Sequence, residues 1–370
     1  MPQLDRATVT IDLRKLQNNV HRVIEALGPD VDVVTVTKAT AGSPEVARAM
    51  LRGGASALAD SRLENIAAMR AAGVEATFWL LRAPTLALAA ETVRLADVSL
   101  ASELASVGAL DEAARAAGTK HLIVAMVDLG DLREGMMPDE LPSFLDVVAQ
   151  MSGIEIAGIG TNLACYGGIE PDADNLGRLA ELAAKAQARL GRPLIVSGGN
   201  SSSIEFAVRT GMPAAVNNLR VGESILLGVS VLTREPILNL HRDVFRVSAP
   251  VIECKVKPSM PIGTITQDAF GAAPEFEDLG LRRRAICAIG RQDAPPTGLA
   301  PVDPHIEVLG ASSDHLILDV EGLAEPPAIG DAIEFVPNYA GLVGLFTSRY
   351  VRKVYVGGPD EETRAQAAAC

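Results

Sequence analysis

The chain has 370 residues, of which 48% are hydrophobic and 4% aromatic, and its formal net charge is −13. This hydrophobic fraction excludes a disordered or fibrous chain, and at about 150 residues per domain the length predicts two or three domains. The acidic balance and the scarcity of aromatic residues argue against a nucleic-acid partner held through its phosphates or stacked bases.

The sequence lacks patterns for export, membrane insertion or metal binding. The first residues, MPQLDRATVT, lack the succession typical of a signal peptide, and no apolar run reaches the ~18 residues of a membrane span. The four cysteines form no C-x-x-C pair, and the five histidines are scattered. We therefore expect a cytoplasmic protein with reduced cysteines, no membrane or nucleic-acid partner and no metal site.

Strand-like runs and helix-like stretches alternate through the first two thirds of the chain. The runs are apolar at odd and even positions alike, as expected for strands buried on both faces. There are eight of them: Val33–Thr37, Ala57–Asp60, Thr77–Leu81, Val98–Ala101, Leu122–Asp128, Ile156–Thr161, Pro193–Val196 and Asn217–Val221. Ser43-Pro44-Glu45 and Gly191 are examples of helix start and stop signals between them. Eight such repeats predict a TIM-type (β/α)8 barrel at residues 10–235, with a doubly wound open sheet as the alternative.

The second part of the chain reads differently. Residues 236–357 contain alternating or apolar runs separated by Gly/Pro turns, such as VFRVSAPVIECKVK, RRRAICAIG and HLILDV. This pattern predicts a mainly β C-terminal domain, followed by a tail at residues 358–370. The strand Ala7–Leu13, which precedes the barrel, also alternates, and we expect it to join this domain.

In a (β/α)8 barrel the active site lies at the C-terminal ends of the strands. The residues that follow the eight runs are cationic or rich in backbone donors, although the protein is acidic overall. We therefore expect an anionic ligand in the barrel mouth. In chain order these residues are Lys38, Arg62, Arg82, Ser102, Asp128 with Arg133, Asn162, the loop Ser197–Ser203, and Arg220–Gly222.

Two of these features point to one cofactor. Lys38 ends the run VVTVT, so we expect its amine over the apolar core, where desolvation favours the uncharged, nucleophilic form. The alternative is a lysine that reaches from the strand end into solvent. The loop SGGNSSS, placed between a strand and a helix, is typical of a phosphate site, or else it is a flexible linker. A lysine facing a phosphate site is the arrangement that holds pyridoxal phosphate.

The motifs that surround these residues resemble a known family over nearly the whole chain. They are TVTKATAG, VDLGDLREG, GGNSSS and LRVGESILLG, followed by PIGTITQDAFG, RRRAICAIGRQD, LGASSDHLILDV and PNYAGLVGLFTSRYV. In this order they resemble the alanine racemase superfamily of fold type III pyridoxal-phosphate enzymes, and within it the ornithine racemase-like branch. The resemblance implies a homodimeric isomerase, a racemase with pyridoxal 5'-phosphate as cofactor.

The resemblance also implies roles for individual residues. Lys38 corresponds to the lysine that binds the cofactor covalently and acts as a base at Cα, and Arg220 to the arginine that faces the pyridine nitrogen. Around the phosphate it places Asn200, Ser201, Gly222, Glu223 and Tyr339. Around the substrate it places Arg133, together with Ser313 and Asp314 from the partner subunit's β-domain.

The chain departs from alanine racemases at four positions. Ala41-Gly42-Ser43 stands where a tyrosine follows the lysine, Asn162 replaces a histidine, and Met126 replaces a carbamylated lysine. Thr264 stands in place of the tyrosine that serves as second base. Asp268 is the candidate replacement, either as base or as a partner for a distal amine; the alternative is a solvated turn acid, and Asp314 is a rival for either role.

The resemblance implies inversion at Cα of a free amino acid, and ornithine or another extended, basic amino acid is the candidate substrate, because it would suit the acids Asp268 and Asp314. The small residues of TKATAG are expected to leave room for a longer side chain than alanine's. Three alternatives stay open: a decarboxylase or an aldolase of the same fold, and a non-enzymatic pyridoxal-phosphate-binding protein. Cys165 is expected to be a small buried residue. For Tyr166 the sequence leaves open whether it lines the site or only packs.

Overall fold

The computed structural model describes residues 6–358, and the chain forms two compact units. One unit is Leu13–Arg242; the other combines the residues up to Asp12 with those from Asp243 onward. The barrel unit is therefore longer than expected at its C-terminal end, because residues 236–242 belong to it. In the described part of the chain, none of the helices is long and apolar enough to cross a membrane.

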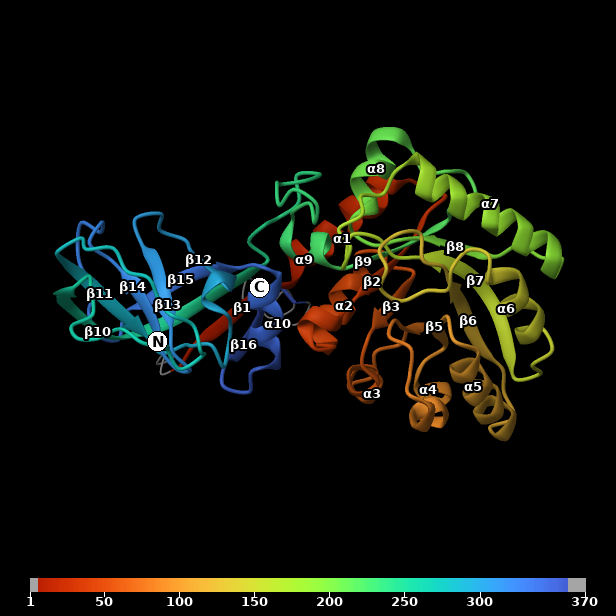
Figure 1. The fold of residues 1–370 in the computed structure, drawn as a ribbon, viewed down its shortest axis with the longest axis horizontal. Helices are drawn as coiled ribbons and strands as arrows, with labels where there is room; N and C mark the ends of the chain where they lie inside the picture. Colours follow the sequence, from red (N-terminus) through yellow and green to blue (C-terminus); the bar gives the residue numbers. More distant parts are fainter. Residues whose placement is uncertain (1–5, 359–370) are drawn as a thin grey trace, which may run out of the picture. The chain divides into compact units, whose positions relative to one another are not determined.

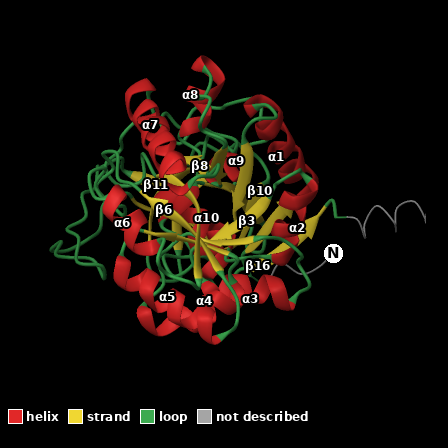
Figure 2. Ribbon diagram, turned by 90° about the vertical axis from the view of Figure 1, so that its right-hand side faces the viewer, coloured by secondary structure: helices red, strands yellow, loops and turns green. Residues whose placement is uncertain are grey.

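The first unit is a closed barrel of eight parallel strands, which confirms the predicted fold class (Figures 1 and 2). The strands pair in chain order and β2 closes on β9. They are β2 (Asp32–Val36), β3 (Ala57–Asp60), β4 (Phe78–Leu80), β5 (Val98–Ala101), β6 (His121–Met126), β7 (Ile154–Thr161), β8 (Ile195–Gly198) and β9 (Asn218–Val221).

Helices surround the strands of this barrel (Figure 2). They are α1 (Leu13–Leu27), α2 (Pro44–Arg52), α3 (Leu63–Ala71), α4 (Ala89–Leu95), α5 (Leu104–Ala116), α6 (Leu141–Val148), α7 (Ala173–Leu190), α8 (Ser203–Thr210) and α9 (Glu223–Leu227), with short 3-10 helices η1 (Lys38–Thr40) and η2 (Leu86–Leu88). The start signals act as expected: the Ser43 side chain accepts a hydrogen bond from the N–H of Val46, and Gly191 ends α7 in a left-handed conformation.

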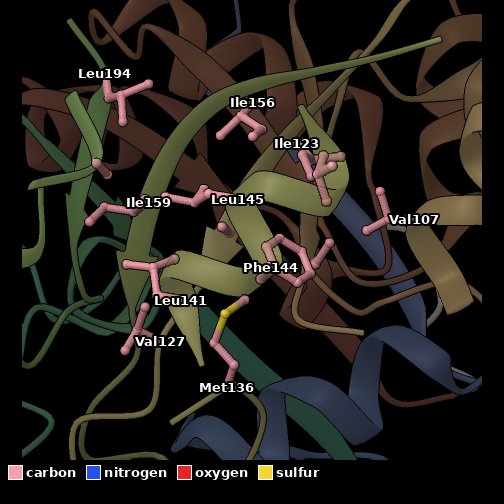
Figure 3. Packing of buried hydrophobic residues seen from close by; sticks show 14 of the residues in the cluster. Val107, Ile123, Val127, Met136, Leu141, Phe144, Leu145, Ile156, Ile159 and Leu194 are labelled. Atoms are coloured by element: carbon pink, nitrogen blue, oxygen red, sulfur yellow. The ribbon is translucent and has the colours of Figure 1, made fainter. Parts of the chain in front are cut away.

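Burial on both faces explains why the strands are apolar at both parities. In β6, Val124 and Met126 belong to the cluster inside the barrel, whereas Ile123 and Ala125 belong to the cluster between the strands and the helices. Figure 3 shows this outer layer, in which side chains of α6 lie among those of β6 and β7. The two clusters make the barrel a packed core with its functional groups at the strand ends.

The second unit is a β-domain with an eight-stranded sheet. It comprises β1 (Thr8–Asp12), β10 (Phe245–Pro258), β11 (Leu281–Cys287), β12 (Leu299–Pro301), β13 (Glu307–Ala311), β14 (Leu316–Asp319), β15 (Ala332–Pro337) and β16 (Arg352–Val356), with η3 (Pro296–Gly298) and α10 (Tyr339–Thr347). β1 pairs antiparallel with β10 and parallel with β16, so the first strand lies in this sheet. All of the expected tail except residue 358 lies outside the described residues.

His121 makes the stability of the barrel depend on pH. It begins β6, is 2% exposed, and its Nε2 lies 2.8 Å from Ser99 Oγ. Burial lowers the pKa of His121 to about 4, and Asp97 partly opposes this shift. The unfolded chain, with a histidine pKa near 6.5, binds more protons between these pH values. The stabilisation is therefore complete above pH 6.5 and falls as the pH drops towards 4, by roughly 2–3 kcal/mol at pH 4.5.

The measurement is urea unfolding of wild type and His121→Gln at pH 7 and pH 4.5, followed by tryptophan fluorescence. Trp79, the chain's one tryptophan, is buried in β4 and therefore reports on the barrel. We expect wild type to lose roughly 2–3 kcal/mol more of its unfolding free energy than the variant does on acidification. Equal losses in the two proteins would contradict the assignment.

Candidate active site at the barrel mouth

Lys38 lies in a tight turn at the end of β2. The strand ends at Val36, and η1 begins at Lys38 itself. Ala41 and Gly42 follow with left-handed φ values of 47° and 65°, which turn the chain back towards α2. Lys38 is exposed, so the expectation of a desolvated amine is wrong: the chain leaves the strand before the lysine, and the side chain is open to solvent.

The small residues after Lys38 are used for packing. Ala39 and Thr40 are 2% and 1% exposed, and a Cβ at Gly42 would lie 2.6 Å from the Cβ of Asn65 in α3. These residues are small because the turn packs closely against α3. Packing therefore accounts for these small residues, and the expectation that TKATAG leaves extra room in the site stays a prediction.

The loop after β8 is an ordered turn. Gly199 has φ of 111°, and a Cβ there would lie 2.6 Å from Ser203 Oγ, so only glycine fits without strain. Asn200 Nδ2 donates to Asn162 Oδ1 at 2.9 Å and to the Leu163 carbonyl at 2.7 Å. Asn200 therefore fixes the loop after β8 to the loop after β7, which excludes the flexible-linker alternative.

Ser201 joins this loop to the start of α9. Its buried Oγ accepts hydrogen bonds from the N–H groups of Gly222 at 3.2 Å and Ser224 at 3.3 Å. The Gly222 N–H, expected to donate to a phosphate, thus donates to Ser201 here. Because Ser201 Oγ accepts twice, its own proton is available for an anion. The Ser201 hydroxyl and the first N–H groups of α8 and α9 are donors of the kind that bind phosphate.

Arg220 is a buried cation in the last strand of the barrel. It is 3% exposed, its Nη2 donates to the Thr161 carbonyl at 2.7 Å, and its Nη1 donates to Ser197 Oγ. Within residues 6–358 it forms no ion pair. Burial lowers the pKa of Arg220 to about 10, which still leaves it protonated at neutral pH. A cation buried without a carboxylate partner is suited to face an electron-rich ligand atom.

Two aspartates organise the loops that surround Arg220. Asp128 accepts from the N–H groups of Gly130, Leu132 and Arg133, and so orients the loop after β6. Asp131, which the sequence analysis missed, is 2% exposed and accepts three backbone N–H groups of the next loop over, those of residues 165–167. These bonds hold the loops after β6 and β7 together.

The structure brings the expected barrel residues together at the strand ends. Cys165, Glu134 and Arg133 lie close enough to Arg220 to affect its pKa. Burial raises the pKa of Glu223, whereas Arg234 and Lys38 lower it, which places the Lys38 ammonium near that carboxylate. Lys38, Ser201, Gly222, Glu223, Asn200, Arg220 and Arg133 therefore belong to one mouth. Arg62 and Arg82 are exposed and make no ion pair in the described chain.

Three of the remaining barrel positions also have clear surroundings. Asn162, in place of the family histidine, accepts from Asn200 and has a buried Nδ2 without a partner. Met126 is buried inside the barrel. Cys165 is exposed, so the expectation of a buried thiol is wrong; its Sγ accepts from Asn200 at 3.4 Å. Tyr166 is 78% exposed, so it is not a packing residue in this structure.

The remaining candidate residues lie in the β-domain. Thr264 is exposed, in the stretch between β10 and β11. The Asp268 carboxylate accepts from the N–H groups of Phe270 at 2.8 Å and Ala272 at 2.9 Å, as in the turn-acid alternative. These backbone hydrogen bonds lower the pKa of Asp268, which makes it a weaker base.

The Ser313–Asp314 pair is held by a neighbouring loop. Asp314 accepts from Gln292 Nε2 at 2.7 Å and from Ser313 Oγ at 2.9 Å, and it is exposed. The adjacent Arg291 packs over the Phe270 ring at 4.3 Å, so the Asp268 turn lies against the same loop. Tyr339 begins α10 and is half-buried. Gln292 has no local signal in the sequence, because its partner is 22 residues away.

The donor set of the barrel mouth fits pyridoxal phosphate. Two buried polar atoms there, Asn162 Nδ2 and Ser224 Oγ, lack a hydrogen-bond partner. Ser201 supplies a hydroxyl proton, Arg220 a buried cation and Lys38 an accessible amine. Donors without partners and unpaired cations suit a ligand that combines a phosphate, a ring nitrogen and an aldehyde.

Comparison with known proteins gives one matching family, two similar relatives and one similar solved structure. Residues 11–230 match the family described as alanine racemase, N-terminal domain. An ornithine racemase of Acetoanaerobium sticklandii is 40% identical, covering 93% of this chain and 98% of the relative. A lysine racemase of Thermotoga maritima is 38% identical, covering 93% and 97%. The structure of an alanine racemase of Bartonella henselae with covalently bound pyridoxal phosphate matches with a TM-score of 0.73 at 20% identity, covering 95% and 99%, a likeness in fold.

Proposed function

The chain belongs to the alanine racemase family, a family of pyridoxal-phosphate enzymes, and from this premise we propose that it racemises a free basic amino acid, ornithine or lysine. The observation that carries the substrate class is the match of ornithine and lysine racemases over 93% of the chain. The proposed substrate class is not based on the room in the site, since the small residues after Lys38 are packed against α3.

The proposed roles follow from the geometry of the mouth. Bound pyridoxal phosphate withdraws electrons from the bound amino acid and so acidifies its Cα–H bond. Lys38, exposed at the end of β2, moves the proton at Cα on one face. Ser201 and the N-termini of α8 and α9 hold the phosphate. Arg133, whose backbone is fixed by Asp128, orients the substrate carboxylate.

Inversion also needs a proton on the opposite face, and a distal ammonium needs an acidic partner. We assign both tasks to the β-domain, supplied by the partner subunit of a homodimer. Asp314 is the better placed acid for the ammonium, because it is exposed and accepts only from the side chains of Gln292 and Ser313. Tyr339 is assigned to the phosphate on the family resemblance. Sedimentation of the purified protein as a monomer would contradict this arrangement.

The alternatives are less well supported. Decarboxylation benefits from a protonated ring nitrogen, which an acid opposite it supplies, whereas this mouth presents the cation Arg220. A non-enzymatic binding protein has no need of the β-domain that follows the barrel. The free thiols of Cys165, Cys254 and Cys287 fit a reducing compartment, and we expect a cytoplasmic enzyme.

The test is a chiral assay with L-ornithine, L-lysine, L-arginine and L-alanine in deuterated water. We expect the D-isomer and Cα deuterium to form from ornithine or lysine with kcat/KM at least about 100-fold above that for alanine, since alanine lacks the distal ammonium that Asp314 is proposed to bind. Release of carbon dioxide or an aldehyde would instead identify a decarboxylase or an aldolase. Absence of any turnover, with coenzyme bound, would leave the binding-protein alternative.

A further inference from the structure

Asp60 is a buried carboxylate that the roles above do not use. It ends β3, is 0% exposed and forms no ion pair within residues 6–358. Its Oδ2 accepts from Thr37 Oγ1 at 2.7 Å, and its Oδ1 accepts from the Arg62 N–H and from Asn65 Nδ2, each at 2.9 Å. Burial raises the pKa of Asp60, and the hydrogen bonds from Thr37, Asn65 and Arg62 oppose this shift. Loss of these hydrogen bonds would leave a buried carboxyl group without partners, which is costly. They therefore hold Asp60 as a fixed point of the structure, meaning that its side chain keeps one position.

Thr37 connects this fixed point to Lys38. Thr37 occupies the N-cap position of η1, where a threonine oxygen ordinarily accepts from a helix N–H. Here it makes no such bond. Its hydroxyl donates instead to Asp60 and, at 3.2 Å, to the Ala59 carbonyl, back towards β3. The side chain thus ties the start of the Lys38 turn to the neighbouring strand.

The backbone of Thr37 holds the rest of the turn. Its carbonyl accepts from the N–H groups of Thr40 at 2.9 Å and Gly42 at 3.3 Å, and also from Thr40 Oγ1 at 2.9 Å. Its own N–H donates to the Ala59 carbonyl at 2.9 Å. The hydrogen bonds of Thr37 therefore hold the turn formed by residues 38–42.

We propose that Asp60, acting through Thr37, is a positioning residue that fixes the backbone from which Lys38 extends into the barrel mouth. This inference rests on the proposed role of Lys38. In the described chain the Lys38 amine makes no hydrogen bond or ion pair, so its place is set by its own Cα and the turn beneath it. Misplacement of a reacting group by about 1 Å can slow a reaction about 100-fold, which makes such an anchor effective.

Two matched substitutions separate positioning from stability. Thr37→Val removes the bond between Asp60 and the turn and keeps the shape of the side chain. Asn65→Ala removes a bond of equal length to the same carboxylate, but on the α3 side, and keeps the Cβ against which Gly42 packs. Thr37→Ser retains the hydroxyl and serves as the conservative variant.

The first readout is hydrogen exchange of the amides of residues 40–42 in the protein without coenzyme. The second is the rate at which added pyridoxal phosphate becomes trapped on Lys38 by borohydride, measured by peptide mass. We expect Thr37→Val to lose about 10-fold in protection and in trapping rate, and Thr37→Ser and Asn65→Ala to stay within about 2-fold of wild type. Thermal unfolding should show similar stability losses for Thr37→Val and Asn65→Ala.

The inference is overturned if Thr37→Val matches wild type in exchange, or if Asn65→Ala impairs exchange and trapping as much as Thr37→Val does. Neither readout needs an amino-acid substrate, so a failure of the proposed racemase activity is seen separately, in the chiral assay. If wild type traps no coenzyme on Lys38, the role of Lys38 fails and this inference is overturned with it.

Discussion

Replacement of Lys38 by alanine is expected to abolish both borohydride trapping of pyridoxal phosphate and racemisation, with turnover reduced at least about 10⁴-fold, or about 5.5 kcal/mol. The reason is that Lys38 provides the accessible amine of the mouth, close to Glu223 and just beyond the end of β2, the strand that pairs with β9. Because Lys38 is exposed, the free energy of unfolding should remain within about 0.5 kcal/mol of wild type.

Two variants control for this result. Lys38→Arg keeps a cation of similar reach but has no amine to condense with an aldehyde, so it should also be inactive and untrapped. Lys120→Ala removes an exposed lysine just before β6, at the opposite end of the barrel strands, and should behave as wild type. An adduct or turnover retained in Lys38→Ala would refute the assigned role.

The barrel was predictable because its strands are buried on both faces. In β6, neighbouring residues belong to different hydrophobic clusters, one on each face of the strand. Each run is therefore apolar at odd and even positions alike, and polar residues mark its two ends. The β-domain was less predictable. The helix α10 has the sequence YAGLVGLFT, with two glycines, and these pack so closely that a Cβ at Gly341 would lie 2.2 Å from the Gly298 carbonyl oxygen. Tertiary packing, not helix propensity, explains that element.

The site was predictable in position and less so in its contacts. Strand ends locate Lys38, Ser201 and Arg220, because parallel strands in a barrel bring their C-terminal ends to one mouth. The anchors that hold the loops were missed: Asp131 accepts from N–H groups 34–36 residues away, and Asp60 from a hydroxyl 23 residues away. Such partners come together only on folding. Lys38 was expected to be desolvated and is exposed, because the strand ends two residues before it.

Arg220→Gln is expected to lower kcat for racemisation about 100-fold and to raise the amount of 2-keto acid released per racemisation event. Arg220 stays protonated at neutral pH, since burial lowers its pKa only to about 10. A permanent cation prevents protonation of a basic nitrogen placed against it, which weakens the electron sink and favours return of the proton to Cα. A neutral glutamine removes that constraint. The proton should then return more often to an atom other than Cα, and transamination should increase.

Arg220→Lys separates charge from geometry. Lysine keeps a cation but loses the planar fork that donates to both Thr161 and Ser197, so kcat should fall while the ratio of keto acid to D-isomer stays near that of wild type. Chiral chromatography and a keto-acid assay on the same samples give the ratio, and Trp79 fluorescence checks that the barrel is folded. If glutamine and lysine change the ratio equally, the charge of Arg220 does not direct the course of the reaction. If neither changes it, Arg220 serves only to hold β9 to the ends of β7 and β8.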